Sequence, residues 1–192
     1  MNKKLYAISI AILLLLTWFS ISTAESTLPP QKQTVLGLYV TAKEAHEMWL
    51  ADKNKIKILD VRTPEEYIFV GHAPMAHNIP FQLINYKMAI RNQGPLMQAN
   101  PNFMAEVGQK FKTSDTIVVI CRSGNRSAAA VNAMAAAGFK TAYSVIDGFE
   151  GDRVKEPSSR AYGKRFKNGW KNSDLPWTDQ LNPELLWIPI DS

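Results

Sequence analysis

The most informative segment of this 192-residue chain reads Thr116-Ile-Val-Val-Ile-Cys-Arg-Ser-Gly-Asn-Arg-Ser-Ala-Ala-Ala-Val-Asn-Ala-Met-Ala-Ala-Ala137. Its opening residues, up to Ile120, are β-branched and almost all apolar, which is typical of a buried strand. The alanine-rich part from Ser127 to Ala137 favours a helix, and Gly138 follows where helices commonly end. No turn signal separates the strand from the polar loop. The segment therefore predicts a strand, a tight loop and a helix, which together form one unit of a parallel sheet.

The same alternation of strands and helices continues on both sides of this segment. Further strands are predicted at residues 35–40, 56–61 and 141–146. Helices are predicted at residues 41–51, 63–67, 81–90 and 101–112, and the first two of them begin with a capping threonine. Strands that alternate with helices indicate an α/β domain with a mainly parallel sheet.

The loop between the central strand and its helix has the composition of a reactive site. It lies at the carboxyl edge of the sheet, where open α/β folds bind their ligands. Its backbone amides and the following helix N-terminus form a nest that attracts anions, and the same field favours a thiolate at Cys121. Arg122 and Arg126 add to this field if they point inward, and Gly124 allows the backbone to bend around the sulfur. The pattern predicts a nucleophilic cysteine that takes sulfur from an anion such as thiosulfate.

Other features of the chain limit this interpretation. Cys121 is the only cysteine, so no internal disulfide can form, and a buried inert cysteine is the alternative reading. His46 and His77 lack metal-ligand spacing with Cys121, so we expect no metal site. His72 is expected to fix a turn rather than to act as a base.

Two motifs carry a family resemblance. Residues 59–67 (Leu-Asp-Val-Arg-Thr-Pro-Glu-Glu-Tyr), followed by Gly-His at 71–72 and Asn-Ile-Pro at 78–80, resemble the first signature of rhodanese domains. Residues 121–127 (Cys-Arg-Ser-Gly-Asn-Arg-Ser) resemble the active-site loop of that family. The match covers about residues 35–151. The chain departs from the family pattern at Ala73 and Met75, and by an insertion of about 17 residues near its end.

The resemblance implies a fold, a mechanism and a set of site residues. The fold is a five-stranded, mainly parallel sheet flanked by helices. Cys121 carries a covalent persulfide, with no other cofactor. The loop binds the donor through its amides and arginines, which are contributed by Arg122, Ser123, Gly124, Asn125 and Arg126. Asp60 and Arg62 are expected to hold the sheet edge near the loop through an internal ion pair or hydrogen bonds, and a direct role at the site is the alternative.

The first 24 residues have the pattern of a signal peptide. Lys3 and Lys4 form a short basic start, residues 5–21 are mostly apolar, and Ser22 and Ala24 suit a cleavage site. A retained membrane anchor is the alternative, because a spanning helix needs roughly 18 apolar residues. We expect the mature chain to be exported to the periplasm.

The remaining residues divide by composition into four parts. A flexible leader at 25–33 precedes a rhodanese-like domain at 34–151, which is followed by a basic insertion at 152–168 and by a closing segment with an aromatic C-terminal arm at 169–192. The insertion holds six Lys or Arg residues against Asp152 and Glu156, a net charge of +4. Because it begins just after the last predicted strand, it should lie beside the mouth of the active site. It either attracts anionic donors, or docks an acidic partner, or has no role.

Three functions fit the pattern to different degrees. A sulfurtransferase would use a small anionic donor and a thiol or cyanide acceptor. A sulfur carrier with little free turnover, docked to an exported partner protein, is the alternative. A cysteine phosphatase is disfavoured, since its loop needs five residues between Cys and Arg and only four separate Cys121 from Arg126. The net charge of +5, which falls to +3 without residues 1–24, is too small to indicate nucleic-acid binding.

Overall fold

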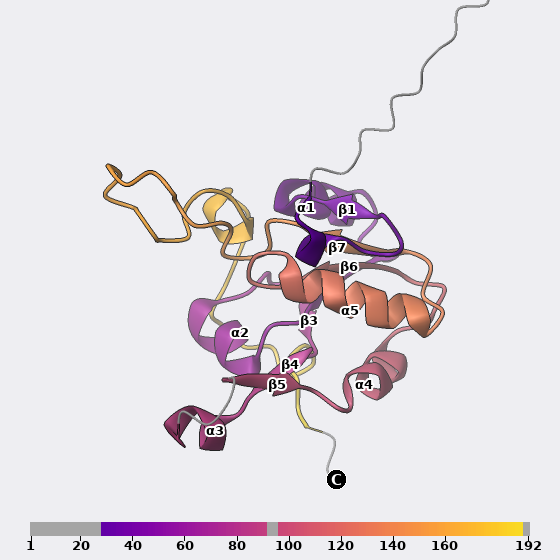
Figure 1. The fold of residues 1–192 in the computed structure, drawn as a ribbon. Coiled ribbons are helices and arrows are strands. Elements are labelled where there is room, and N and C mark those ends of the chain that lie inside the picture. The colour runs from indigo at the N-terminus through magenta and orange to yellow at the C-terminus, as the bar shows by residue number, and fades with distance from the viewer. Residues whose placement is uncertain (1–27, 92–95, 190–192) are drawn as a thin grey trace, which may run out of the picture.

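A computed structural model describes residues 28–91 and 96–189 of the chain (Figure 1). The predicted signal peptide at 1–24 lies outside the described residues. The core is a five-stranded sheet in which every neighbouring pair is parallel, and this confirms the α/β prediction. The strands, in spatial order, are β1 (Tyr39–Val40), β7 (Ala142–Val145), β6 (Thr116–Ile120), β2 (Ile56–Asp60) and β3 (Ala76–Asn78).

Helices cover both faces of this sheet. They are α1 (Ala42–Ala51), α2 (Pro64–Val70), α4 (Phe103–Lys110) and α5 (Asn125–Ala136). α3 (Tyr86–Arg91) lies apart from the sheet (Figure 1), and there are two short 3₁₀ turns, η1 (Pro30–Lys32) and η2 (Trp170–Asn172), in the described residues. Successive residues of β6 point to opposite faces, so Val119 packs with residues of α4 and α5, whereas Val118 packs with residues of α1 and α2. The central strand is therefore buried on both sides, as its continuous apolar run requires.

Both helices with a predicted threonine cap, α1 and α2, begin with a capping box. The Thr41 hydroxyl accepts the Glu44 amide, and the Thr63 hydroxyl accepts the Glu66 amide at 3.2 Å. In return, each glutamate accepts the amide of its threonine. These contacts satisfy amides that would otherwise have no partner at the helix start.

The prediction of one helix at 81–90 is wrong in its first half. Residues Gln82–Ile84 form β4, which pairs antiparallel with β5 (Met97–Ala99) in a separate two-stranded sheet. α3 begins only at Tyr86, after Asn85, whose side chain accepts the Met88 amide at 3.1 Å. The strand that pairs with β4 begins 15 residues further along the chain. The local spacing of apolar residues does not reveal a partner at that distance.

Other element boundaries also differ from the prediction, and α2, for example, continues to Val70 instead of ending at residue 67. β1 covers only the last two residues of the predicted strand at 35–40, because Gly37 turns the chain there with a φ of 63°. α5 begins at Asn125 instead of Ser127, so the reactive loop is shorter than expected.

The described part of the expected flexible leader is packed against the domain. Residues 30–32 form η1, and η1 lies along α5. The Asn132 side chain donates to the Gln33 carbonyl at 3.4 Å, and Lys32 Nζ donates to the Ile146 carbonyl oxygen at 2.8 Å. Short polar segments gain order from such contacts with a rigid partner, and the sequence alone does not reveal them.

The basic insertion leaves and re-enters the domain at one point, where Gly151 and Gly169 lie against each other. A Cβ on either glycine would collide with the opposite backbone. After the insertion, the Trp170 amide donates to the Gly148 carbonyl at 2.9 Å, and the Trp170 ring is fully buried. In Figure 1 the insertion projects away from the rest of the domain as a long loop.

The C-terminal arm continues from this point along the edge of the sheet. The Asn78 amide of β3 donates to the Leu185 carbonyl at 2.8 Å, and His72 and Thr178 form an isolated antiparallel bridge. The arm thus covers the edge strand, which would otherwise expose unpaired backbone groups. Within residues 28–91 and 96–189, no helix has the length and apolar character needed to span a membrane.

Candidate active site

The Cys121 sulfur lies at the floor of the loop that joins β6 to α5. The residue is 1% exposed, and the Gly124 amide donates to its Sγ at 3.2 Å. The Ser127 hydroxyl, at the first turn of α5, lies 3.6 Å from Sγ. An amide donor and the N-terminus of α5 thus both lie beside the sulfur.

A turn after β7 holds this loop from behind. The Phe149 amide donates to the Cys121 carbonyl at 2.7 Å, and the Glu150 amide donates to the Arg122 carbonyl at 3.0 Å. Gly148 makes this contact possible, since a Cβ there would lie 2.5 Å from the Cys121 carbonyl oxygen and 2.5 Å from the Ser123 amide. Gly124 has a φ of 101°, and a Cβ added there would lie 2.3 Å from the Ile146 carbonyl oxygen. The sequence did not assign a role to Gly148, although its position just after a strand end was visible.

Arg126 is held by an ion pair with Glu66 of α2. Its Nη1 and Nη2 donate to the two carboxylate oxygens at 2.5 Å and 2.7 Å, and both side chains are 13% exposed. Burial acts to raise the pKa of Glu66, but the hydrogen bonds and charge of Arg126 outweigh burial and lower that pKa. The pair therefore stays charged, and Arg126 is fixed beside the loop. Nothing in the sequence linked Glu66 to the site, because the partners lie 60 residues apart.

Above Cys121 is an open cavity of about 270 Å³. Four of the five predicted donor-binding residues line it, while Gly124 lies behind the sulfur. The full lining comprises Gln82, Met97, Cys121, Arg122, Ser123, Asn125, Arg126 and Arg165. Gln82 and Met97 come from the small β4–β5 sheet, which therefore forms one wall of the site.

Arg165 brings the basic insertion into this cavity, as the sequence suggested for the insertion as a whole. Its Nη1 donates to the Gly151 carbonyl at 2.6 Å, which anchors the side chain. Burial lowers the pKa of Arg165, and the nearby charges of Arg122 and Arg153 lower it further. Among the described residues, neither Arg122 nor Arg165 has a carboxylate within 4.0 Å. The cavity therefore offers unpaired positive charge to an anion.

Asp60 and Arg62 form the predicted internal ion pair and do not line the cavity. Both are fully buried, with Arg62 Nη2 at 2.6 Å from Asp60 Oδ2 and at 2.8 Å from the Gly71 carbonyl. Asn78 donates to the backbone carbonyls of both residues at 3.0 Å. This buried network fixes the carboxyl end of β2 next to β6 and the loop.

The histidines have structural surroundings. His72 is 1% exposed, its Nδ1 lies 3.0 Å from the Tyr67 carbonyl, and its ring stacks on Tyr67. Burial lowers the pKa of His72, so it is neutral at ordinary pH and fixes the turn as predicted. In the part of the chain that the structure describes, no group of three His, Cys, Asp or Glu side chains could hold a metal ion.

Comparisons with known proteins place this geometry in a family. The model of the rhodanese-like domain matches residues 41–153, more than half of the chain. The chain is 37% identical over 111 residues to thiosulfate sulfurtransferase 16, chloroplastic, of Arabidopsis thaliana, an alignment that covers 57% of this chain and 82% of that protein. It is 29% identical over 140 residues to an uncharacterised protein of Rickettsia prowazekii, covering 72% and 94% of the two chains.

A solved structure shows the same fold. The crystal structure of Rv0390 from M. tuberculosis superposes with a TM-score of 0.58 at 28% identity, and the match covers 73% of this chain and 96% of that one. The parallel five-stranded sheet, the cysteine loop at its carboxyl edge and the matched family model lead to one conclusion. This chain belongs to the rhodanese-like domain family.

Proposed function

We propose that this protein is a sulfurtransferase that moves a sulfane sulfur from an anionic donor, such as thiosulfate, to a thiophilic acceptor through a persulfide on Cys121. Membership of the rhodanese-like family supports the general class of reaction. The observation that carries the specific proposal is the setting of the sulfur. Cys121 Sγ accepts the Gly124 amide at the floor of a cavity into which Arg122 and Arg165 bring unpaired positive charge.

In the first half-reaction the Cys121 thiolate attacks the outer sulfur of thiosulfate. A sulfur–sulfur bond forms to Cys121, the sulfur–sulfur bond of the donor breaks, and sulfite leaves with the electron pair. Arg122 and Arg165 attract the donor oxygens and stabilise the negative charge that develops on sulfite. The loop amides and the N-terminus of α5 then stabilise the anionic outer sulfur of the persulfide.

In the second half-reaction an acceptor attacks that outer sulfur. Cyanide would leave as thiocyanate, and a thiolate would leave as a persulfide. The bond between the two sulfurs breaks, and its electron pair returns to Cys121 as thiolate. The cycle closes without a further reactant, so the same cysteine serves as nucleophile and as leaving group.

A sulfur carrier with little free turnover would use the same persulfide, so turnover separates the two proposals. The chain should catalyse steady-state thiocyanate formation from thiosulfate and cyanide. Cys121→Ser, an almost isosteric change, should abolish this activity while circular dichroism and thermal unfolding remain close to those of the parent protein. Activity retained in Cys121→Ser would exclude the persulfide mechanism, and loading of the parent protein without turnover would favour the carrier.

A further inference from the structure

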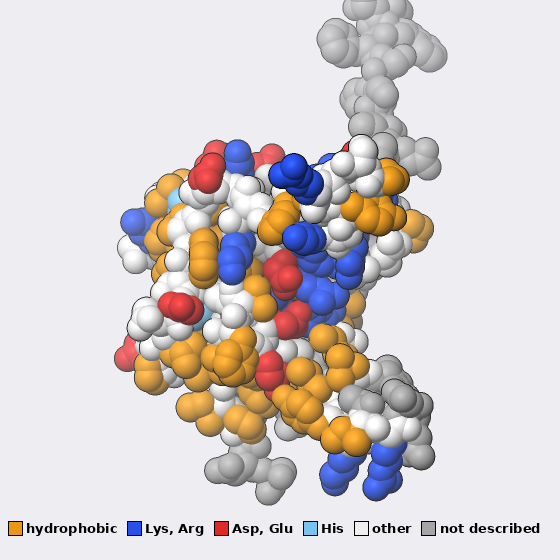
Figure 2. All heavy atoms as spheres, turned by 90° about the vertical axis from the view of Figure 1, so that its left-hand side faces the viewer, with side chains coloured by type: hydrophobic (Ala, Val, Ile, Leu, Met, Phe, Trp, Pro, Cys, Tyr) orange, Lys and Arg blue, Asp and Glu red, His pale blue; other side chains and the backbone are white. Residues whose placement is uncertain are grey.

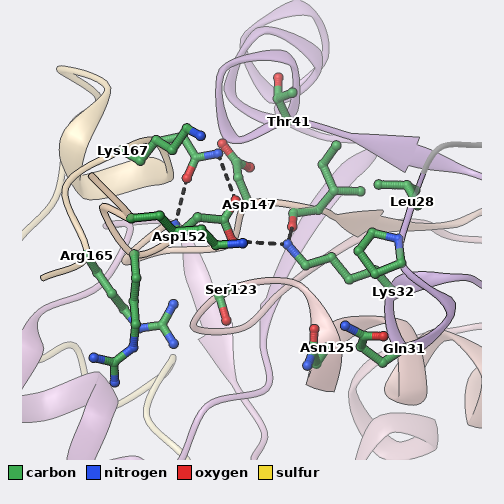
Figure 3. A pocket seen from close by; sticks show the side chains of 15 residues that line it. Leu28, Gln31, Lys32, Thr41, Ser123, Asn125, Asp147, Asp152, Arg165 and Lys167 are labelled. Carbon is green, nitrogen blue, oxygen red and sulfur yellow. Dashed lines mark hydrogen bonds and ion pairs between the residues drawn. The ribbon is translucent and has the colours of Figure 1, made fainter. Parts of the chain in front are cut away.

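A second, larger hollow of about 620 Å³ adjoins the Cys121 cavity. One wall comes from the N-terminal residues 28–32 and the other from the basic insertion, with Ser123 and Asn125 between them (Figure 3). We call it the basic groove. Ser123, Asn125 and Arg165 line both hollows, so the basic groove opens directly into the Cys121 cavity.

The walls of the basic groove are fixed to each other. Lys32 Nζ lies 3.3 Å from Asp152 Oδ1 and also donates to the Ile146 carbonyl at 2.8 Å, which joins the N-terminal wall to the insertion and to β7. The Asn168 side chain accepts the Asp152 amide at 2.7 Å, which closes the base of the insertion. Most of both walls lies outside residues 41–153, the part that the family model matches.

The charge of the basic groove is largely unpaired. Its acids are already engaged, because Asp152 pairs with Lys32, and Asp147 accepts the amides of Ala42 and Gly169. By contrast, four cations on the insertion have no carboxylate within 4.0 Å among the described residues; they are Arg153, Lys155, Arg165 and Lys167. Figure 2 shows Lys and Arg side chains gathered across the middle of the face that carries the insertion. Such a surface attracts an anionic ligand and steers its approach.

We propose that the basic groove docks an acidic segment of a partner protein whose cysteine accepts the sulfur from Cys121. This proposal rests on the sulfurtransferase function proposed above. The cavity of about 270 Å³ already accommodates a small donor, so the adjoining groove of about 620 Å³ suits a ligand that extends beyond the reacting atom. A ligand that reaches the persulfide must also supply a nucleophile, and proteins carry thiols whereas ordinary nucleic acids and lipids do not.

The transfer step requires only the two sulfur centres. The acceptor thiolate attacks the outer sulfur of the Cys121 persulfide, and the bond between the two sulfurs breaks. The electron pair returns to Cys121, and the acceptor leaves as a persulfide. Docked carboxylates beside the acceptor cysteine would hold it at the mouth of the cavity and so raise its effective concentration.

The test uses two synthetic peptides and two double variants of the full chain. One peptide places a cysteine between aspartates, and the other replaces the aspartates with asparagines. Lys155→Gln/Lys167→Gln removes two charges from the basic groove. Lys112→Gln/Lys140→Gln removes two exposed charges just before β6 and β7, at the amino edge of the sheet, and serves as the matched control. The measured quantity is the ratio of second-order sulfur-transfer rates to the two peptides, so differences in persulfide loading cancel.

The parent protein should favour the acidic peptide at least about 10-fold at low salt, and the preference should shrink as salt rises. Lys155→Gln/Lys167→Gln should lose most of this preference, and Lys112→Gln/Lys140→Gln should keep it. The proposal is overturned if the parent protein shows no preference, or if the groove variant retains it.

A binding measurement separates this proposal from the proposed function. Fluorescence anisotropy with the acidic peptide carrying Ser in place of its cysteine reports docking without chemistry. If this peptide binds but the protein transfers no sulfur, docking at the basic groove is supported and the persulfide function is rejected. A single-stranded oligonucleotide of equal charge tests the alternative that the basic groove binds nucleic acid. If it binds as tightly as the peptide and loses affinity in Lys155→Gln/Lys167→Gln, the basic groove is a nucleic-acid site and the proposal is wrong.

Discussion

The two arginines of the Cys121 loop both line its cavity, and they have different partners. Arg126 is paired with Glu66, whereas Arg122 has no carboxylate partner among the described residues. One oxygen of Glu66 also accepts the Thr63 amide at 3.0 Å, so a single carboxylate caps α2 and fixes the active-site loop. We infer that Arg126 mainly positions the loop and that Arg122 remains available to the donor.

If Arg126 positions the loop, Glu66→Gln should destabilise the protein strongly, although the change in side-chain size is small. Glu66→Gln keeps the size of the side chain but leaves the Arg126 guanidinium without its counter-charge, which should cost about 3 kcal/mol of stability. Glu65→Gln is the matched control, because Glu65 accepts the exposed Tyr86 hydroxyl and pairs with no cation among the described residues, so its change should cost less than about 1 kcal/mol. Urea unfolding of both variants measures the difference. Equal losses would show that the pair with Arg126 does not hold the loop.

Residue types and spacing around Cys121 were sufficient to identify five of the eight residues that line the cavity. They were not sufficient for Glu66 or Arg165, because each reaches the site through a fold contact between distant segments. Glu66 was visible as part of a capping box, and only the meeting of α2 with the loop gives it a second partner.

At the scale of elements, the turn after β7 is as important to the site as the loop itself. Its residues donate to the Cys121 and Arg122 carbonyls, and Gly148 permits this close approach. The loop is therefore supported on one side by α2 and on the other by this turn. Preorganised loops of this kind keep their amides aimed at the reacting sulfur.

Gly148→Ala tests this support. Gly148 has a φ of 66°, and an added Cβ would collide with loop backbone, so we expect a loss of about 2–4 kcal/mol and a large fall in sulfur-transfer rate. Gly163→Ala is the control, since Gly163 has a φ of 77° but nothing lies within 4 Å of its added Cβ. The control should lose about 1 kcal/mol, from backbone strain alone. Thermal unfolding and the thiosulfate–cyanide assay report both effects, and similar losses at the two positions would contradict the account.

Helices and strands were predicted correctly where the local sequence indicates them. They were missed where the structure of a segment depends on pairing with a distant segment. The buried strand at 116–120 and the capped helices lie close to their predicted positions. The β4–β5 pair was missed because each strand is only three residues long and gains its hydrogen bonds from the other. This small sheet nevertheless supplies one wall of the cavity.

For the whole molecule, the partly buried His77 makes stability depend on pH. Burial, with lesser contributions from Lys110 and Lys57, lowers the pKa of His77 from 6.5 to about 4. Between these values the unfolded chain binds a proton at this site that the folded chain does not, so stability rises with pH from about 4 to 6.5 and is level above. His77→Gln should reduce this slope, measured as urea midpoints between pH 4.5 and 7.5. An unchanged slope would show that His77 does not titrate with unfolding.

The α/β domain was predictable because its predicted strands and helices alternate along the sequence. The arrangement of its ends was not. The leader was expected to be flexible, yet its described part forms a wall of the basic groove, and the charge of the insertion gave only its general placement. Such contacts join segments more than 100 residues apart, as between Lys32 and Asp152.

The central claim is that Cys121 carries the transferred sulfur, and intact mass spectrometry after incubation with thiosulfate tests it most directly. The chain has a single cysteine, so any persulfide can be assigned without ambiguity. If Cys121 carries the sulfur, the protein should gain one sulfur atom, cyanide should remove it as thiocyanate, and Cys121→Ser should gain none. No mass increase in the parent protein, or an equal increase in Cys121→Ser, would contradict it.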